Sequence, residues 1–198
     1  MIFNVLHIIK EELSHYLDPD QSVKPVVLAN ISKLDANDPD DEDIGENIVL
    51  TLINTKEEST LKNFPNQVVE NGTVKYKRPK VFLNLYVLIS SNLGGYVESL
   101  KCLSRIIEFF QGKKVFTQAD TFAYRAGSEN IDLQSFRFIV DLHTPSFEEL
   151  NHIWGTLGGR QLPSLMYKVS IIELERDLVK GGGGLIQEVQ GNLEHINS

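Results

Sequence analysis

The sequence predicts an α+β fold in which helices flank a mainly antiparallel sheet. One reason is that apolar residues recur at three- and four-residue steps over residues 2–17 and 96–111, as they do in amphipathic helices. A second is that residues 80–90 are apolar on both faces of a strand, which favours a central position covered on each side. A third is that several connections between predicted elements are short enough for antiparallel pairing.

The N-terminal part predicts one helix and two strands. The helix covers residues 2–17 and stops at Asp18-Pro19-Asp20. A short strand over 25–31 begins with proline, where no backbone donor is needed. A loop rich in Asp and Glu, residues 35–46 and here named the acidic loop, separates it from a second strand over 48–55.

The middle of the chain predicts a polar excursion and then a helix. Residues 56–78 are polar, and Asn71-Gly72 is typical of a hairpin turn between strands at 68–69 and 74–76. After the central strand and a turn at residues 92–95, the second helix covers 96–111. Gly112 is expected at the C-cap of this helix.

The C-terminal part predicts strands at 115–116 and 131–142, a third helix, and a last strand over 164–175. Ser146 and Glu149 form a capping-box pattern at the start of the third helix. The pair Gly158-Gly159 is expected to end that helix.

Four consecutive glycines at 181–184 predict a flexible joint. We therefore expect one domain over residues 1–176, followed by a glycine linker and flexible tail over 177–198. Such a tail orders on a partner or stays disordered.

The composition limits the classes of function. With 198 residues and 41% apolar content, the chain is long enough for one domain with a substantial core. The 27 acidic residues outnumber the 19 basic ones, and the net charge is -8. Because phosphate binding depends on clustered Lys and Arg, this balance argues against a nucleic-acid partner.

Cys102 is the single cysteine, so the chain holds no internal disulfide and no thiolate metal cluster. This suits a reducing cytoplasm. Residues 1–10 lack the basic region and cleavage site of a signal peptide. No apolar run approaches the roughly 18–20 residues that a membrane span needs, so no span is expected.

We predict no catalytic, cofactor-binding or metal-binding residue and expect the protein not to be an enzyme. Cys102 with His143 or His152 has the residue types of a nucleophile and base, but Cys102 falls in an apolar helix, where a free cysteine acts as a small core group. His7 and His15 have no further ligand at metal spacing. The paired glycines match no phosphate-binding or nucleophile motif.

The acidic loop invites comparison with a calcium-binding loop. Asp35, Asn37 and Glu46 fall at its first, third and twelfth places. Pro39 and Asp40 fall at the fifth and sixth places, and the sixth needs glycine for its turn. The match fails, and a solvated acidic loop is the better interpretation.

The segment from Glu148 to Ser164 has the character of a contact surface. It holds the only tryptophan, ends a helix with paired glycines, and leads into a strand through Leu162-Pro163-Ser164. No proton-transfer or metal-binding spacing accompanies it. Trp154 itself has two interpretations, core anchor or interface anchor, because aromatic residues are prominent in both.

Three groups of segments together resemble a known family. They are Asn47–Asn63, then Phe82–Leu88 with Leu103–Lys113, and finally Glu148–Arg160. With these segments in this order, the chain resembles the cap, or tail-terminator, proteins of extracellular contractile injection systems. That group includes antifeeding-prophage-like and Photorhabdus-virulence-cassette-like particles. The resemblance covers about residues 1–175.

The resemblance implies a phage tail-terminator-like fold and a structural role. Such proteins form a ring of six subunits on the end of the inner tube and outer sheath, so the implied partners are further copies of the chain, the tube protein and the sheath protein. Assembly would take place in the cytoplasm, after which the cap is part of the particle. The candidate interface residues are Trp154, Leu157, Gly158, Gly159 and Arg160 at the end of the third helix, with Asp38, Asp40, Asp41, Glu42 and Asp43 in the acidic loop.

Three further hypotheses stay open at this point. The tail over 177–198 would be able to add a strand to an exposed edge of the sheath. A monomeric adaptor or ligand-binding module is the first alternative to a cap. A hydrolase that uses Cys102 or the histidines is the second.

Overall fold

The computed structural model describes residues 2–17, 26–33, 44–58, 67–70, 73–77, 82–121, 136–171 and 179–184. The helices are α1 (Ile2–Leu17), α2 (Tyr96–Gly112) and α4 (Phe147–Thr156), with a short 3₁₀ helix η1 (Ile31–Lys33). The strands are β1 (Val26–Leu28), β2 (Ile48–Glu57), β3 (Gln67–Glu70), β4 (Thr73–Lys77), β5 (Leu83–Ser91), β6 (Val115–Thr117), β7 (Arg137–His143), β8 (Ser164–Ile171) and β9 (Val179–Gly184).

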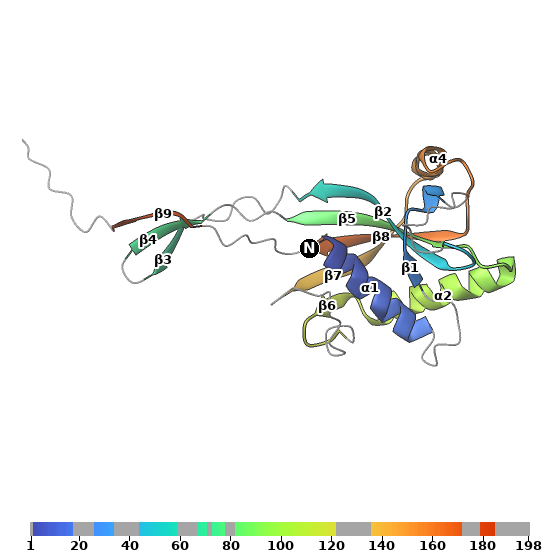
Figure 1. The fold of residues 1–198 in the computed structure, drawn as a ribbon, viewed down its shortest axis with the longest axis horizontal. Coiled ribbons are helices and arrows are strands. Elements are labelled where there is room, and N and C mark those ends of the chain that lie inside the picture. The colour runs from blue at the N-terminus through green and yellow to red at the C-terminus, as the bar shows by residue number, and fades with distance from the viewer. Residues whose placement is uncertain are drawn as a thin grey trace, which may run out of the picture.

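These strands form two sheets (Figure 1). The larger sheet has six strands in the order β1-β2-β5-β8-β7-β6, and the smaller has the order β3-β4-β9. Only β1 and β2 pair in parallel, and every other neighbouring pair is antiparallel. The predicted α+β fold with a mainly antiparallel sheet is therefore confirmed.

One face of the six-stranded sheet packs against α1 and α2. Along β5, the side chains of Leu85, Val87 and Ile89 point to this face, as the two-residue period of a strand requires. Ile8 of α1 and Ile106 of α2 are fully buried against it. The amphipathic stripes of the two predicted helices are thus the surfaces that cover the sheet.

The opposite face packs against α4 and η1, which lie across the sheet from α1 and α2 (Figure 1). Leu88 of β5 points to this side, together with Val49 of β2 and Met166 of β8. Apolar residues on both faces of β5 therefore have partners on both sides, which confirms its predicted central position.

The helix α2 ends one residue later than expected. Gly112 is the last helical residue, and the C-cap is Lys113, whose N–H donates to the carbonyl of Phe109. Lys113 has extended backbone, with φ -133°, which needs no glycine. Its side chain bonds to Glu12 of α1 at 2.6 Å and to the carbonyl of Asp120 at 2.8 Å, which fixes this residue where the chain leaves the helix.

The hairpin predicted in the polar excursion is present as β3 and β4, with Val69 paired to Val74. The glycines at 181–184 predict a flexible joint, but in the structure they belong to β9, which pairs with β4 from Val179 to Gly184. The free side of β4 supplies hydrogen-bond partners for the backbone N–H and C=O groups of the glycine run. Figure 1 shows this small sheet beyond the ends of β2 and β5.

Some predictions fall on residues outside the described ranges. They are the start of the strand predicted at 131–142, the end of that at 164–175, most of the acidic loop, and residues 185–198 of the tail. The boundary between 1–176 and 177–198 stays a prediction.

Candidate functional site

The start of α4 is fixed by the capping box that the sequence predicts. The Ser146 hydroxyl accepts a hydrogen bond from the Glu149 N–H at 3.2 Å, and the Glu149 carboxylate accepts one from the Ser146 N–H at 2.8 Å. The latter bond, from backbone to carboxylate, is the main reason that the pKa of Glu149 is lowered. Two otherwise unpaired donors of the first helical turn are satisfied in this way.

The end of α4 depends on two glycines in left-handed conformation. The Gly159 N–H donates to the carbonyl of Trp154 at 2.7 Å, closing the last turn. Gly158 has φ +104° and Gly159 has φ +78°, while no atom lies within 4 Å of the position that a Cβ would take on either. The requirement for glycine is therefore conformational and not a matter of space. The prediction that this pair ends the helix is confirmed.

The Trp154 ring lies in the core of this chain. Only 4% of its surface is exposed, and it packs with Val27, Ile31 and Val49 on the α4 side of the sheet. Of the two roles left open by the sequence, the structure gives it that of a core anchor, which holds α4 against the sheet. Its indole nitrogen is buried and has no hydrogen-bond partner among the described residues.

The other residues expected near this tryptophan lie at the surface. Leu157 is half-buried, and Gly158, Gly159 and Arg160 are exposed in the turn that follows α4. They form one continuous surface, here named the α4 end surface. The acidic residues Asp38, Asp40, Asp41, Glu42 and Asp43 lie outside the described residues.

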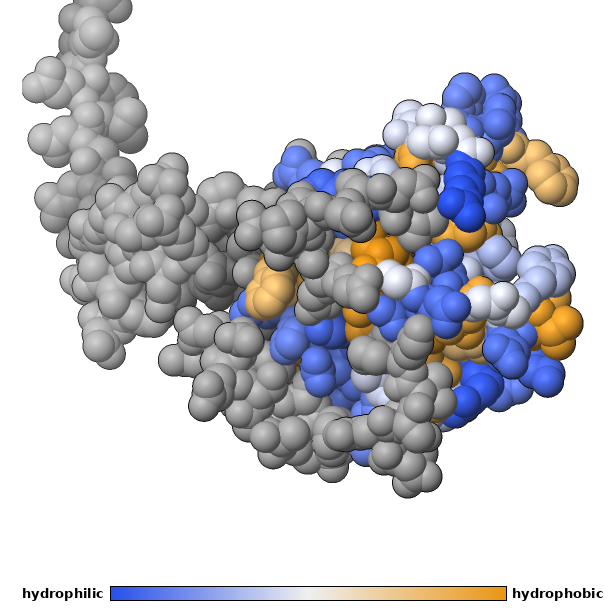
Figure 2. Space-filling view, turned by 45° about the vertical axis from the view of Figure 1, so that its right-hand side comes forward, coloured by the Kyte–Doolittle hydropathy of each residue, from blue (hydrophilic) through white to orange (hydrophobic). Residues whose placement is uncertain are grey.

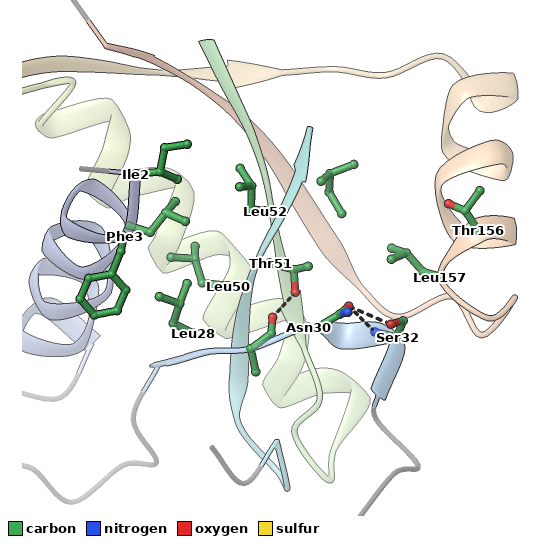
Figure 3. Close-up of a pocket in the computed structure, with 13 residues that line it drawn as sticks. Ile2, Phe3, Leu28, Asn30, Ser32, Leu50, Thr51, Leu52, Thr156 and Leu157 are labelled. Carbon is green, nitrogen blue, oxygen red and sulfur yellow. Dashed lines mark hydrogen bonds between the residues drawn. The ribbon is translucent and has the colours of Figure 1, made fainter. Parts of the chain in front are cut away.

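An open groove runs from α1 to the α4 end surface across the edge of β2 (Figure 3). Its volume is about 690 Å³. In Figure 3, Ile2, Phe3, Leu28, Leu50 and Leu52 lie on one side of β2, and Asn30, Ser32, Thr156 and Leu157 lie on the other. The residues that line it come from α1, β1, η1, β2 and the end of α4. The apolar periodicity of the sequence does not reveal this groove, because the groove exists only where β1 leaves the sheet.

The departure of β1 from the sheet is fixed by one side chain. The Ala29 N–H bonds to the carbonyl of Leu50 at 3.2 Å, which continues the ladder by one residue. The Thr51 hydroxyl then donates to the carbonyl of Ala29 at 2.7 Å and accepts from the N–H of Ile31 at 3.2 Å. These bonds satisfy the backbone at the turn, and η1 begins at Ile31.

The residues considered for catalysis do not come together. Cys102 lies on α2 and packs against the core on the α1 side of the sheet, whereas His143 and His152 line a hollow of about 370 Å³ beside α4, on the other side. Burial raises the pKa of the Cys102 thiol, and the nearby Arg105 opposes this only in part. The thiol is therefore protonated at neutral pH, which is unfavourable for a nucleophile.

Within the described ranges, no group of three or more His, Cys, Asp and Glu side chains is arranged to hold a metal ion. No helix in the same ranges has the length and hydropathy that crossing a bilayer requires. Figure 2 shows apolar side chains, in orange, reaching the surface between hydrophilic ones. Among the described residues, Tyr96 and Val97 of α2 and Phe147 of α4 are the most exposed large apolar ones, with Phe147 exposed to 92%.

A family model decides the classification. The model for the Pvc16 N-terminal domain matches residues 4–188. The chain belongs to this family. The match covers both sheets of the structure, including β9. No curated protein sequence matches the chain.

Two solved structures share the fold of this Pvc16 N-terminal domain protein. The sheath/tube terminator of PVC, an extracellular contractile injection system in its extended state, matches with a TM-score of 0.63 at 13% identity, over 100% of this chain and 65% of that one. The tube-terminating cap of the anti-feeding prophage AFP matches with a TM-score of 0.61 at 14% identity, over 98% of this chain and 62% of that one. The chain thus spans less than two thirds of the length of either protein.

Proposed function

We propose that this protein is a structural cap, a tail terminator that binds the end of the inner tube and sheath of a contractile injection system and ends their assembly. The observation that carries the proposal is the match of the whole chain to the PVC sheath/tube terminator, supported by the AFP cap and by the family match. The proposed partners are further copies of this chain in a six-membered ring, the tube protein and the sheath protein.

The physics of tube growth explains what such a cap must do. A tube lengthens because each ring exposes the surface that the next ring binds. A terminator matches that surface on one face and presents nothing equivalent on the other. Head-to-tail contacts that close around a rotation axis form a ring, and closure ends growth in its plane. A net charge of -8 favours a soluble cap that does not stack on itself.

The α4 end surface is the proposed contact with the particle, together with the acidic loop. Leu157 supplies an apolar group, and Arg160 supplies a charge at its edge. The fixed left-handed turn at Gly158 and Gly159 holds both on a rigid helix end, so that little conformational freedom is lost on binding. Assembly would take place in the cytoplasm of the producing cell, before the cap becomes part of the particle.

The test is electron microscopy of particles from a producer that lacks this protein, with the same strain complemented by the intact gene as the control. A cap predicts tubes of uncontrolled length, missing sheaths or unstable particle ends, all restored by complementation. Particles of normal length and full sheath cover would overturn the proposal. A stable monomer that binds neither tube nor sheath would point instead to an adaptor, and turnover that Cys102→Ala abolishes would point to a hydrolase.

A further inference from the structure

The six-stranded sheet is stepped at both of its edges, because each edge strand is short. At one edge, β1 pairs with β2 only from Ile48 to Leu50. No strand in the described part of the chain pairs with that side of β2 from Leu52 to Lys56. At the other edge, β6 pairs with β7 only from Arg137 to Ile139. Within the described ranges, no strand lies beside the outer edge of β7 from Asp141 to His143.

The two steps lie at opposite ends of the sheet. Phe138 of β7 pairs with Ile171 of β8, Ile171 pairs with Leu83 of β5, and Leu83 pairs with Glu57 of β2. The strand β6 is therefore level with the Glu57 end of the sheet, whereas β1 is level with its Ile48 end. At the Glu57 end, the sheet has an extra strand, β6, at one edge and a vacant position beside β2 at the other. At the Ile48 end, the extra strand is β1 and the vacant position is beside β7.

The strand directions also agree between the two edges. The successive antiparallel pairings from β2 to β6 make β6 run in the same direction as β2. In a second copy placed head to tail, β6 would enter the vacant position beside β2, in line with β1 and parallel to β2. The same placement brings β1 of one copy beside the vacant stretch of β7 in the other, running antiparallel. A stagger of about two residues brings both contacts into register, since an even number keeps the side chains of adjacent strands on matching faces. A shear between strands is also what a sheet that closes on itself requires.

Apolar side chains accompany both edges. Beside the vacant stretch of β2, the groove described above is lined by Phe3, which is 53% exposed, and by the half-buried Leu28 and Leu52. At the other edge, Val115 of β6 is 37% exposed and Leu142 of β7 is 51% exposed. Covering these groups removes apolar surface from water, which favours association.

We infer that the vacant stretch of β2 receives β6 of a second copy of this chain, so that neighbouring subunits share one continuous sheet. The inference rests on the proposed ring and adds to it the surface through which subunits join. A strand from a different protein would fill one recess and leave the other, whereas a second copy fills both with a single contact. In a closed ring every edge is paired, which removes the exposed strand edges that otherwise promote aggregation.

Cross-linking tests the contact directly. In a Cys102→Ala background, Asn54→Cys places a thiol on the vacant stretch of β2, and Val115→Cys places one on β6, on the same face of the shared sheet as Asn54. With both in one chain, oxidation or a short bis-maleimide linker is expected to give a ladder of linked chains that ends at six. The matched control carries Asn54→Cys with Tyr96→Cys, since Tyr96 is exposed at the start of α2 and does not belong to either edge strand. Equal linking in the two variants would overturn the inference.

A proline substitution tests the backbone of the same edge. The Glu58 N–H bonds to the carbonyl of Phe82 in the chain segment leading to β5, so alternation along β2 turns the Thr55 N–H away from β5 and toward the vacant position. Thr55→Pro removes that donor and is expected to abolish the oligomer measured by native mass spectrometry, while circular dichroism shows a folded subunit. Thr55→Ala keeps the donor and is expected to retain the oligomer.

The outcomes separate the contact from the proposed function. If Thr55→Pro is folded and still forms the wild-type ring, the shared sheet is wrong and the ring stands. If Thr55→Pro does not fold, the cross-linking result decides. If the wild-type chain stays monomeric both alone and with the tube, the ring and the shared sheet are both overturned.

Discussion

Thr51 and Ala29 are joined by a 2.7 Å hydrogen bond that marks where the chain leaves the sheet. The threonine lies on β2, and the alanine follows the last residue of β1. One buried hydroxyl therefore ends β1 after three residues and leaves the remaining edge of β2 open. The groove in Figure 3 exists because of this relationship.

Replacing this residue by Thr51→Val should destabilise the protein. The change keeps the side-chain shape but leaves the carbonyl of Ala29 and the N–H of Ile31 without their partner. An unsatisfied buried polar group costs about 1–3 kcal/mol, so we expect the free energy of unfolding to fall by about 2 kcal/mol in urea denaturation. The control is Thr55→Val, which changes an exposed residue of the same strand. Equal stability of the two variants would contradict the role given to this hydroxyl.

Alanine substitutions at Gly155 in α4 and at Gly158 after it should change the stability of the protein in opposite directions. Gly155 is within the helix and Gly158 follows it with φ +104°, and no atom lies within 4 Å of the position that a Cβ would take on either. Gly155→Ala should therefore stabilise the protein by about 0.5–1 kcal/mol, because alanine is the better helix former. Gly158→Ala should destabilise it by about 1 kcal/mol, because a side chain is strained in left-handed backbone. Thermal unfolding of the two variants measures both, and shifts of the same sign would contradict this account.

The pair of Lys113 and Glu12 ties the end of α2 to α1. The Lys113 ammonium group lies 2.6 Å from a carboxylate oxygen of Glu12, whose side chain is buried. Lys113→Met would leave that carboxylate without this cation and is expected to reduce the free energy of unfolding by about 2 kcal/mol. The matched control is Lys114→Met, which removes the same charge from the next, exposed residue. Denaturation curves that shift equally for both would show that the pair contributes little.

The prediction of individual elements from the sequence succeeded where the signals are local. The stripe of α1 and the capping box at Ser146 and Glu149 depend on residues within a few positions of one another. The central place of β5 followed from its two apolar faces. In each case, the physical cause is contained in the segment itself.

The remaining features depend on contacts between distant segments. The glycines of β9 have backbone freedom, but whether a strand forms depends on the open side of β4, more than a hundred residues earlier. The length of β1 depends on Thr51, which periodicity does not single out. Trp154 had two possible places, and only the position of α4 over Val49 and Met166 decides between them.

Alkaline pH should destabilise the fold through Tyr167. Burial of this side chain among core residues of the α1 side raises the pKa of its hydroxyl from 10.0 to about 12. Because the folded state favours the protonated form, the contribution is fully present below pH 10 and is lost as the pH rises from 10 through about 12. By pH 12 the loss is about 2 kcal/mol, from the usual energy of one pKa unit.

Tyr167→Phe removes the ionising group and should flatten this part of the pH profile, measured as the free energy of unfolding at a series of alkaline pH values. The control is Tyr96→Phe, which removes a hydroxyl from an exposed residue and should leave the profile of the wild type unchanged. The thiol of Cys102, whose pKa burial also raises, contributes a loss of the same sign and is present in both variants. A Tyr167→Phe profile as steep as that of the Tyr96→Phe variant would show that the tyrosine does not ionise in this range.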